Sequence, residues 1–428
     1  LVLMANQVSA VAANKPVLVF APESLNLAEV TRTLQIAKVG ARSFEGVFTS
    51  YDSRGRNQSF IVQAGFRIIP LQPQLSDASI ELFWKKNRGE GLAEDYFSEQ
   101  GLCARVESER ALYRELKPRA VITGFCLSTA LSARAAGIPL VWINQTTWLS
   151  EYFEKWAEWP DAIDSPASRL LPDRIRDRLA KWATPVTFWT MNRGFNRVAK
   201  KLGVGRFTGS ALLEGDHNLF AEPPDFSGLE VPSRLSGRHT FIGPLLGGLP
   251  LEVPQAVRDL PRDRPIVYFA MGSSGVEDLI VRLVAAFADR PYRVIAPVGP
   301  LVRKQGIRPP DNVVVTDWLP AEEVNPMADV SVVHGGIGTL MTACAAGTPI
   351  VAIPNGNPEQ ECNVQCLVRK GIAVQLHQRR ITEADVLAAI DRALADPVAK
   401  AKAREFQASV LAMNGPERAA CFLEERFA

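Results

Sequence analysis

Short apolar runs alternate with helical stretches along the first half of the chain, and this alternation limits the fold more than any other feature. The runs 16–20 (PVLVF), 119–124 (RAVITG) and 138–144 (IPLVWIN) are separated by the helical stretches 28–41 and 126–137. Strands that are apolar along their whole length are buried on both faces, which is typical of a parallel sheet covered by helices. The first half therefore predicts an α/β domain with a doubly wound parallel sheet.

The same alternation starts again after a connecting segment. Residues 222–264 are rich in proline and glycine, as linkers between domains often are. The apolar runs that follow are 265–275, 292–299, 312–320, 328–336 and 348–354. Since 428 residues suit two domains of roughly 200 residues each, we expect two similar Rossmann-like domains that face each other across a cleft.

These patterns predict where the domains begin and end. An N-terminal domain at 1–221 is followed by the linker at 222–264 and by a C-terminal domain at 265–410. The last residues, 411–428, are predicted to form a helical tail, which can pack back on the N-terminal domain.

The composition excludes some classes of function. Lys and Arg number 48 and Asp and Glu 46, whereas a nucleic-acid binder needs a clustered basic face. The six cysteines are scattered and lack histidines at metal-ligand spacing, so we expect reduced thiols, no metal site and a cytoplasmic protein. The first 16 residues have no basic start, and no apolar run is long enough to span a bilayer; we therefore expect neither a signal peptide nor a membrane span.

The sequence HGGIGT, from His334 to Thr339, has the features of a phosphate-binding turn. It follows the apolar run DVSVV and precedes a stretch of small residues that predicts a helix. Ligands of open α/β sheets bind at the carboxyl ends of strands, where a helix N-terminus offers free N–H groups and a partial positive charge. Gly335, Gly336 and Gly338 allow the backbone to approach a phosphate, and the His334 and Thr339 side chains add donors. The alternative is a glycine-rich turn that serves packing only.

Two other predicted strands in this half also end in residues suited to a nucleotide. In AMGSSG, the N–H and O–H donors of Gly272, Ser273 and Ser274 can face the same diphosphate from the opposite side. In DWLP, Trp318 can stack on a nucleobase while the backbone beside it, at Leu319, binds the edge of the base. A tryptophan of the core is the alternative interpretation of Trp318.

A fourth segment, GNPEQECN, carries Glu359 and Gln360, which can hold the hydroxyl groups of a sugar. A solvated loop with a helix cap is the alternative. Along the chain the four segments occur in the order AMGSSG, DWLP, HGGIGT and GNPEQECN. In this order, from Gly272 to Asn363, they resemble the nucleotide-sugar half of the family 1 glycosyltransferases of the GT-B fold. Two stretches of the N-terminal half, FAPESLNLAEVTRTLQIAK and EGDHNLFAEPPDF, resemble bacterial macrolide-type and glycolipid transferases, including rhamnosyltransferases of mycobacterial phenolic glycolipids.

The resemblance implies an inverting, metal-independent transferase that uses a UDP- or dTDP-sugar as co-substrate and needs no further cofactor. The implied diphosphate contacts are Gly272, Ser273, Ser274, His334, Gly335, Gly336, Gly338 and Thr339. The implied contacts to the rest of the donor are Trp318 and Leu319 for the base, Thr342 for the ribose, and Glu359 with Gln360 for the sugar. Donors at a helix N-terminus, rather than a metal, would stabilise the leaving diphosphate.

Three positions depart from the family pattern. The family's general base is a histidine, and Glu29 stands at its position, with Arg32 where proline is common. The aspartate that orients the histidine is replaced by Gly124, and Thr342 replaces a common glutamate at the ribose. Glu29 is therefore the candidate base, with Glu23 as a second candidate, although Arg32 can instead pair with Glu29 one helical turn away. A phenolic acceptor, with a pKa of about 10, would ask less of a carboxylate base than an alcohol.

The N-terminal half holds seven of the eight tryptophans, and in this fold it shapes the acceptor pocket. We predict that Trp84, Trp142 and Trp148 line a pocket for an apolar or aromatic acceptor, although at least half of the tryptophans are expected to pack in the core. The neighbouring segment 168–182 (SRLLPDRIRDRLAKW) is basic and amphipathic, which is compatible with a solvated helix face and also with peripheral contact to a membrane.

Two alternatives to a transferase stay open at this point. Loss of the His–Asp pair also fits a non-catalytic nucleotide-sugar-binding homologue that assists another transferase. A nucleotide-sugar epimerase or hydrolase can use the same scaffold. The identity of the sugar, and the choice between a monomer and a dimer, do not follow from the sequence.

Overall fold

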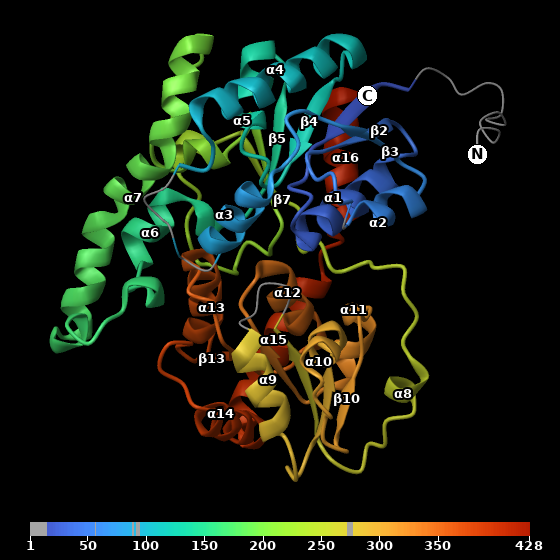
Figure 1. Cartoon of the computed structure of the whole chain (residues 1–428), viewed down its shortest axis with the longest axis vertical. Coiled ribbons are helices and arrows are strands. Elements are labelled where there is room, and N and C mark those ends of the chain that lie inside the picture. Colours follow the sequence, from blue (N-terminus) through green and yellow to red (C-terminus); the bar gives the residue numbers. More distant parts are fainter. Residues whose placement is uncertain (1–14, 56, 88–89, 91–94, 272–276) are drawn as a thin grey trace.

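The structure is a computed structural model that describes residues 15–55, 57–87, 90, 95–271 and 277–428. It consists of two α/β domains, one above the other in Figure 1. Among the described residues, no helix has the length and apolar character needed to cross a membrane.

The N-terminal sheet is parallel throughout, with the strand order β3-β2-β1-β4-β5-β6-β7 in the described part of the chain. Its strands are β1 (Val17–Phe20), β2 (Glu45–Ser50), β3 (Arg67–Pro70), β4 (Ala120–Thr123), β5 (Leu140–Asn144), β6 (His217–Phe220) and β7 (His239–Phe241). Its helices include α1 (Leu27–Gly40), α2 (Gln58–Gln63), α3 (Asp77–Asn87), α4 (Glu99–Leu116), α5 (Thr129–Ala136), α6 (Ser150–Trp156) and α7 (Asp173–Leu202). The order of the strands reverses between β1 and β4, and ligands of such sheets bind at that reversal.

The C-terminal sheet has the same construction, with the order β10-β9-β8-β11-β12-β13 and only parallel pairs. Its strands are β8 (Ile266–Ala270), β9 (Arg293–Ala296), β10 (Val313–Val315), β11 (Val330–Val333), β12 (Ile350–Ala352) and β13 (Ala373–Gln375). The helices around it include α9 (Glu277–Ala286), α10 (Gly299–Gln305), α11 (Ala321–Val324), α12 (Ile337–Ala346), α13 (Pro358–Lys370), α14 (Glu383–Ala395) and α15 (Pro397–Leu411). The prediction of two doubly wound sheets is confirmed.

The end of the chain returns to the N-terminal domain. Helix α16 (Gly415–Phe427) packs against α1, and its Leu423 joins the core under the first sheet. Arg42, just after α1, donates hydrogen bonds of 2.6 Å to Glu417 and to Glu424 of α16. The two domains are therefore connected both by the linker and by this helix (Figure 1).

Candidate functional site

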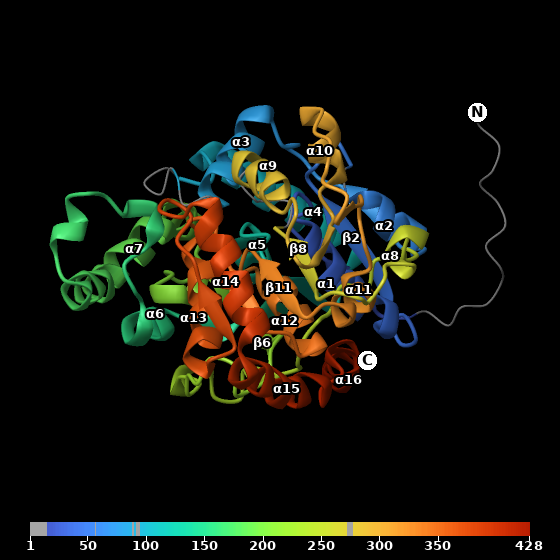
Figure 2. The ribbon, with the colours of Figure 1, turned by 90° about the horizontal axis from the view of Figure 1, so that it is seen from below.

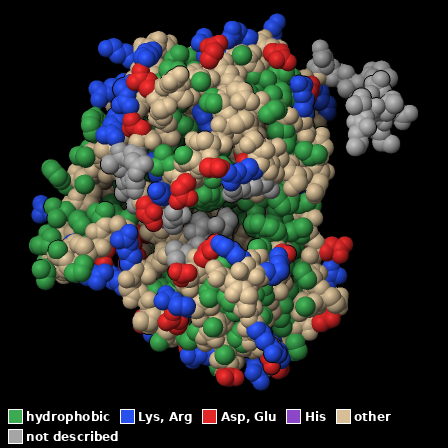
Figure 3. Space-filling model, in the orientation of Figure 1, with side chains coloured by type: hydrophobic (Ala, Val, Ile, Leu, Met, Phe, Trp, Pro, Cys, Tyr) green, Lys and Arg blue, Asp and Glu red, His purple; other side chains and the backbone are tan. Residues whose placement is uncertain are grey.

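A cleft of about 1120 Å³ lies between the two domains. Its lining comes from α1, α3 and α7 on the N-terminal side and from the start of α12 and α13 on the C-terminal side. Figure 3 shows the surface hollowed between the two domains. The reversal points of both sheets, β1/β4 and β8/β11, open toward this space.

The predicted phosphate-binding turn lies at one wall of the cleft. Strand β11 ends at Val333, and Gly336 is the N-cap of α12. Gly335 has a φ of +96°, and a Cβ there would come within 2.8 Å of Val364 on α13, so the turn requires glycine at this position. Of the five predicted contacts in this turn, His334, Gly336, Gly338 and Thr339 line the cleft and Gly335 does not. The free N–H groups of the first turn of α12 are available there.

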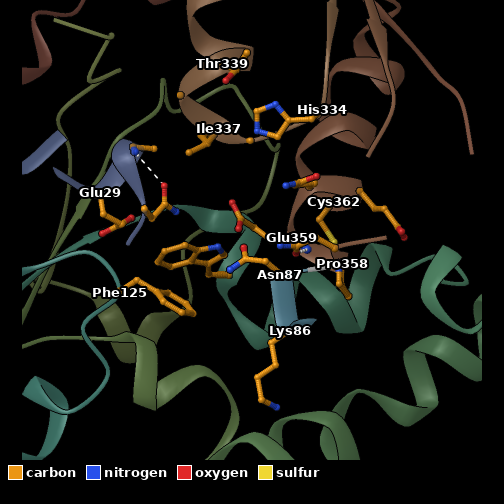
Figure 4. Close-up of a pocket in the computed structure, with 18 of the residues that line it drawn as sticks. Glu29, Lys86, Asn87, Phe125, His334, Ile337, Thr339, Pro358, Glu359 and Cys362 are labelled. Atoms are coloured by element: carbon orange, nitrogen blue, oxygen red, sulfur yellow. Dashed lines mark hydrogen bonds between the residues drawn. The ribbon is translucent and has the colours of Figure 1, made fainter. Parts of the chain in front are cut away.

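The His334 imidazole is neutral at ordinary pH, because burial lowers its pKa to about 4. Its Nδ1 has no hydrogen-bond partner among the described residues. A neutral imidazole still carries one N–H donor, which can be offered to a phosphate oxygen without adding a charge. Figure 4 shows the ring beside Ile337 and Thr339 at the pocket wall.

The donor-sugar candidates sit at the start of α13. Asn357 caps this helix, with its side chain accepting a hydrogen bond of 2.9 Å from the Glu359 N–H. The Glu359 carboxyl accepts hydrogen bonds from Gln145 (3.1 Å) and Asn363 (3.2 Å), and burial raises its pKa. Because Gln145 belongs to the N-terminal domain, the position of Glu359 is set from both sides of the cleft. Gln145 follows the carboxyl end of β5, a signal that the sequence offered and that sequence reasoning missed.

The other predicted donor contacts have mixed environments. Trp318 is 48 % exposed and, with the buried Leu319, lines the cleft. The Thr342 hydroxyl also lies at the cleft but donates to the Gly338 carbonyl inside α12 (2.9 Å). The Gln360 side-chain oxygen accepts from the Asn355 N–H (3.0 Å). The predicted contacts Gly272, Ser273 and Ser274 lie outside the described residues.

Glu29 lies on the opposite wall, in the first turn of α1. It is only 2 % exposed and forms an ion pair with Arg32, one turn further along the helix. A Cβ on Gly124 would lie 1.9 Å from Glu29 Oε2, so the carboxylate occupies the space that a side chain at position 124 would need. The two departures from the family pattern are therefore coupled: the glycine at 124 makes room for the glutamate at 29.

Two side chains of the Glu29 region have contrasting environments. The Arg32 side chain also lines the cleft, and its Nε and Nη1 have no hydrogen-bond partner among the described residues. Glu23, the second candidate base, is buried near Arg105 and is absent from the cleft lining, so this prediction is wrong. Its chain position, close after β1, suggested the cleft, but the side chain points into the protein interior.

The acceptor side of the cleft is aromatic. Trp84 and Trp148 line it, as predicted, and Phe125 adds a ring at 5.6 Å, edge-on to Trp148. Phe125 follows Gly124 at the end of β4, a position that sequence reasoning overlooked. Trp142 is fully buried in the hydrophobic core and does not line the cleft, because β5 is an inner strand covered on both faces. The prediction of Trp142 as an acceptor contact is wrong.

Comparisons with known proteins point to one family. Residues 284–425 match the family model for the C-terminal domain of erythromycin biosynthesis protein CIII-like proteins. A PGL/p-HBAD biosynthesis glycosyltransferase of Mycobacterium tuberculosis is 29 % identical over 315 residues, which is 73 % of this chain and 71 % of the relative. A PGL/p-HBAD biosynthesis rhamnosyltransferase of Mycobacterium bovis is 30 % identical over 298 residues, or 69 % of this chain and 64 % of the relative.

The fold has close counterparts among solved structures. The glycosyltransferase VinC in complex with dTDP aligns with a TM-score of 0.67 over 96 % of this chain and 99 % of VinC, at 20 % identity. The structural likeness extends over both domains. Together these comparisons support a family 1 glycosyltransferase of the GT-B fold.

Proposed function

We propose that the enzyme moves a sugar from a UDP- or dTDP-sugar to a hydroxyl group of an apolar or aromatic acceptor, a glycolipid included, with inversion at the anomeric carbon and without a metal. One observation carries this proposal: the phosphate-type turn at His334 and the aromatic wall at Phe125 and Trp148 line the same cleft, with Glu29 on the acceptor side. Figure 4 shows Glu29 and Glu359 projecting into this pocket from different domains.

The leaving diphosphate would be stabilised by the start of α12. The helix dipole places about half a positive charge at its N-terminus, and the glycines allow the phosphates to approach the free N–H groups. Neutral His334 adds an N–H donor. Stabilising the charge that develops on the leaving group is the largest contribution that such a site makes to the rate.

The acceptor oxygen would attack the anomeric carbon from the side of Glu29. The new C–O bond forms as the bond to the nucleotide diphosphate breaks, and the hydroxyl proton passes to the Glu29 carboxylate. In this role the Glu29 carboxylate would keep its contact with Arg32 through its other oxygen. Glu359, which accepts hydrogen bonds from Gln145 and Asn363, would hold the sugar during transfer.

The direct test measures release of nucleotide diphosphate from a panel of UDP- and dTDP-sugars, with pooled phenolic and lipid acceptors. We expect release that depends on the acceptor and a loss of roughly 10²–10⁴-fold in Glu29→Gln. The control is Glu115→Gln, the same change at an exposed position of α4, outside the cleft lining. Release without acceptor would indicate a hydrolase, and product analysis would reveal an epimerase.

A second candidate function rests on the absence of the family's His–Asp pair. A non-catalytic homologue would bind the nucleotide sugar and release nothing with any acceptor. In that case Glu29→Gln would leave donor binding unchanged and have no turnover to lose.

A further inference from the structure

Helix α7 carries a row of exposed apolar side chains along one face. Its members, spaced alternately four and three residues apart, are Ile175, Leu179, Trp182, Val186 and Trp189. This spacing places them on one side of the helix, and they are between 41 and 77 % exposed. Leu170 and Leu171 extend the same surface just before the helix. We call these seven residues the apolar stripe; exposed apolar surface of this extent marks an interaction site.

A row of cations runs beside the apolar stripe. Arg174, Arg178 and Lys181 each precede a stripe residue by one position, so they share its spacing and lie about 100° around the helix from it. No ion pair of these three is present among the described residues. Two nearby acidic groups are bound elsewhere, since Asp164 pairs with Arg169, Arg176 and Arg380, and Asp173 pairs with Arg176. Two others offset part of the positive charge: Asp177 accepts a hydrogen bond of 2.9 Å from the Trp159 N–H, and Glu158 lies within the electrostatic range of Lys181.

The stripe continues into the cleft. Leu179 and Trp182 belong to both the stripe and the cleft lining, and Ile163 is likewise exposed and lines the cleft. Figures 1 and 2 show α7 at the edge of the molecule, standing away from both sheets. In Figure 3 hydrophobic side chains gather over this projecting lobe, with Lys and Arg side chains at its margins.

Among possible occupants, an anionic lipid surface matches both rows. Tryptophans and branched aliphatic side chains enter the boundary between headgroups and acyl chains, and long cationic side chains reach back to the headgroups. A partner helix would match the spacing of the stripe but would leave the three unpaired cations without a counterpart. The connection to the cleft adds a reason: an acceptor dissolved in the bilayer could enter without crossing water.

We propose that the apolar stripe and its cationic row dock the enzyme on an anionic membrane surface, with the mouth of the cleft toward the bilayer. Docking itself does not depend on the proposed function; only the delivery of a lipid-dissolved acceptor rests on it. The orientation follows from the residues that the stripe and the cleft share.

The test is sedimentation of the full chain with vesicles, in the absence of donor and acceptor. Vesicles of phosphatidylglycerol and phosphatidylcholine should bind the protein at least roughly tenfold more tightly than phosphatidylcholine alone. Removing three cations, in Arg174→Gln/Arg178→Gln/Lys181→Gln, should weaken that binding on the order of a hundredfold, and high salt should do the same.

A second variant removes apolar side chains that do not line the cleft. Ile175→Ser/Trp189→Ser should lose vesicle binding, whereas the control Val62→Ser/Leu411→Ser, two similarly exposed positions elsewhere, should retain it. Transfer to a water-soluble acceptor should be unchanged in both. Failure of the wild type to bind anionic vesicles would overturn the proposal. So would a dimer in sedimentation velocity that Ile175→Ser/Trp189→Ser disrupts, since the stripe would then be an interface between copies. Because no transfer is measured in the vesicle assay, its failure is distinct from failure of the proposed function.

Discussion

Replacing Gly124 by alanine should disable the enzyme through Glu29. The new Cβ would stand 1.9 Å from Oε2 and 2.7 Å from Cδ of Glu29. An ordinary C···O contact is about 3.3 Å, so the carboxylate must retreat by roughly 1.4 Å. Glu29 and Arg32 are 2 % and 6 % exposed, and the retreat separates their buried ion pair.

The size of the effect follows from that separation. Removing one partner of a buried pair costs about 3–5 kcal/mol, and since both partners remain here we expect about 3 kcal/mol. For a domain of this size that is a fall of about 6–12 °C in unfolding temperature. A catalytic group displaced by more than 1 Å lowers turnover on the order of a hundredfold, while donor binding in the other domain should be unaffected.

The assay combines thermal unfolding, donor titration and nucleotide-diphosphate release. Gly205→Ala is the matched control, because a Cβ there meets nothing within 4 Å and the position is exposed. The double variant Glu29→His/Gly124→Asp restores the family's residue pair and should recover turnover relative to Gly124→Asp alone, which brings a second carboxylate against Glu29. If Gly124→Ala is as stable and as active as Gly205→Ala, then catalysis does not require the Glu29 carboxylate to occupy the space beside Gly124.

Three further predictions concern the C-terminal domain. The pKa of His334 is lowered to about 4 from an unfolded value of 6.5, so the unfolded chain binds more protons than the folded chain between these two pH values. The free energy of unfolding, measured by urea titration, should therefore fall by about 3 kcal/mol as the pH drops from 6.5 to 4. His334→Gln should remove this dependence on pH. Burial and the charge of Asp161 raise the pKa of Glu361 to about 8, so the folded chain holds a proton that the unfolded chain releases. The free energy of unfolding should therefore fall as the pH rises from 4.5 to 8. The same slope of unfolding free energy against pH in the wild type and in Glu361→Gln would contradict this. Trp318→Ala should weaken binding of UDP or dTDP roughly 10–100-fold in calorimetry if the ring stacks on the base, with little change in turnover at saturating donor.

The sequence predicted the fold, and the place of the glycine turn at the edge of the second sheet, because both depend on local pattern. Uniformly apolar strands predict a parallel sheet. A glycine turn directly after such a strand lies at the edge formed by the carboxyl ends of the strands, where ligands bind, and this does not depend on distant parts of the chain. His334 and Thr339 could therefore be placed before any coordinates were known.

The remaining features depend on contacts between distant residues. Trp142 and Trp148 are six positions apart, yet one is enclosed in the sheet and the other faces the cleft, and aromatic content alone cannot separate them. The fit of Glu29 against Gly124 spans 95 positions and is visible only where β4 and α1 meet. From the sequence, the replacements at positions 29 and 124 look like two independent departures from the family pattern. In the structure, the glycine at 124 leaves the space that the Glu29 carboxylate fills.

The carboxylate base also bears on the choice of acceptor. A free glutamate side chain has a pKa of about 4.3, against about 6.5 for imidazole, so a carboxylate is in general a weaker base than a histidine. A phenol, with a pKa of about 10, gives up its proton more easily than an aliphatic alcohol. We therefore expect kcat/KM to rise as the pKa falls along a series of substituted phenols, and alcohols of similar bulk to react far more slowly.

Glu29→Gln sharpens this test. Without a base, the attacking oxygen carries more negative charge in the transition state, so the loss should be largest for alcohols and smallest for the most acidic phenol. A residue that only positions its neighbours would slow every acceptor by the same factor, and such a uniform loss would refute the role of Glu29 as base. The cleft already offers aromatic acceptors the rings of Phe125 and Trp148, so the chemistry of the base and the shape of the pocket favour the same class of acceptor.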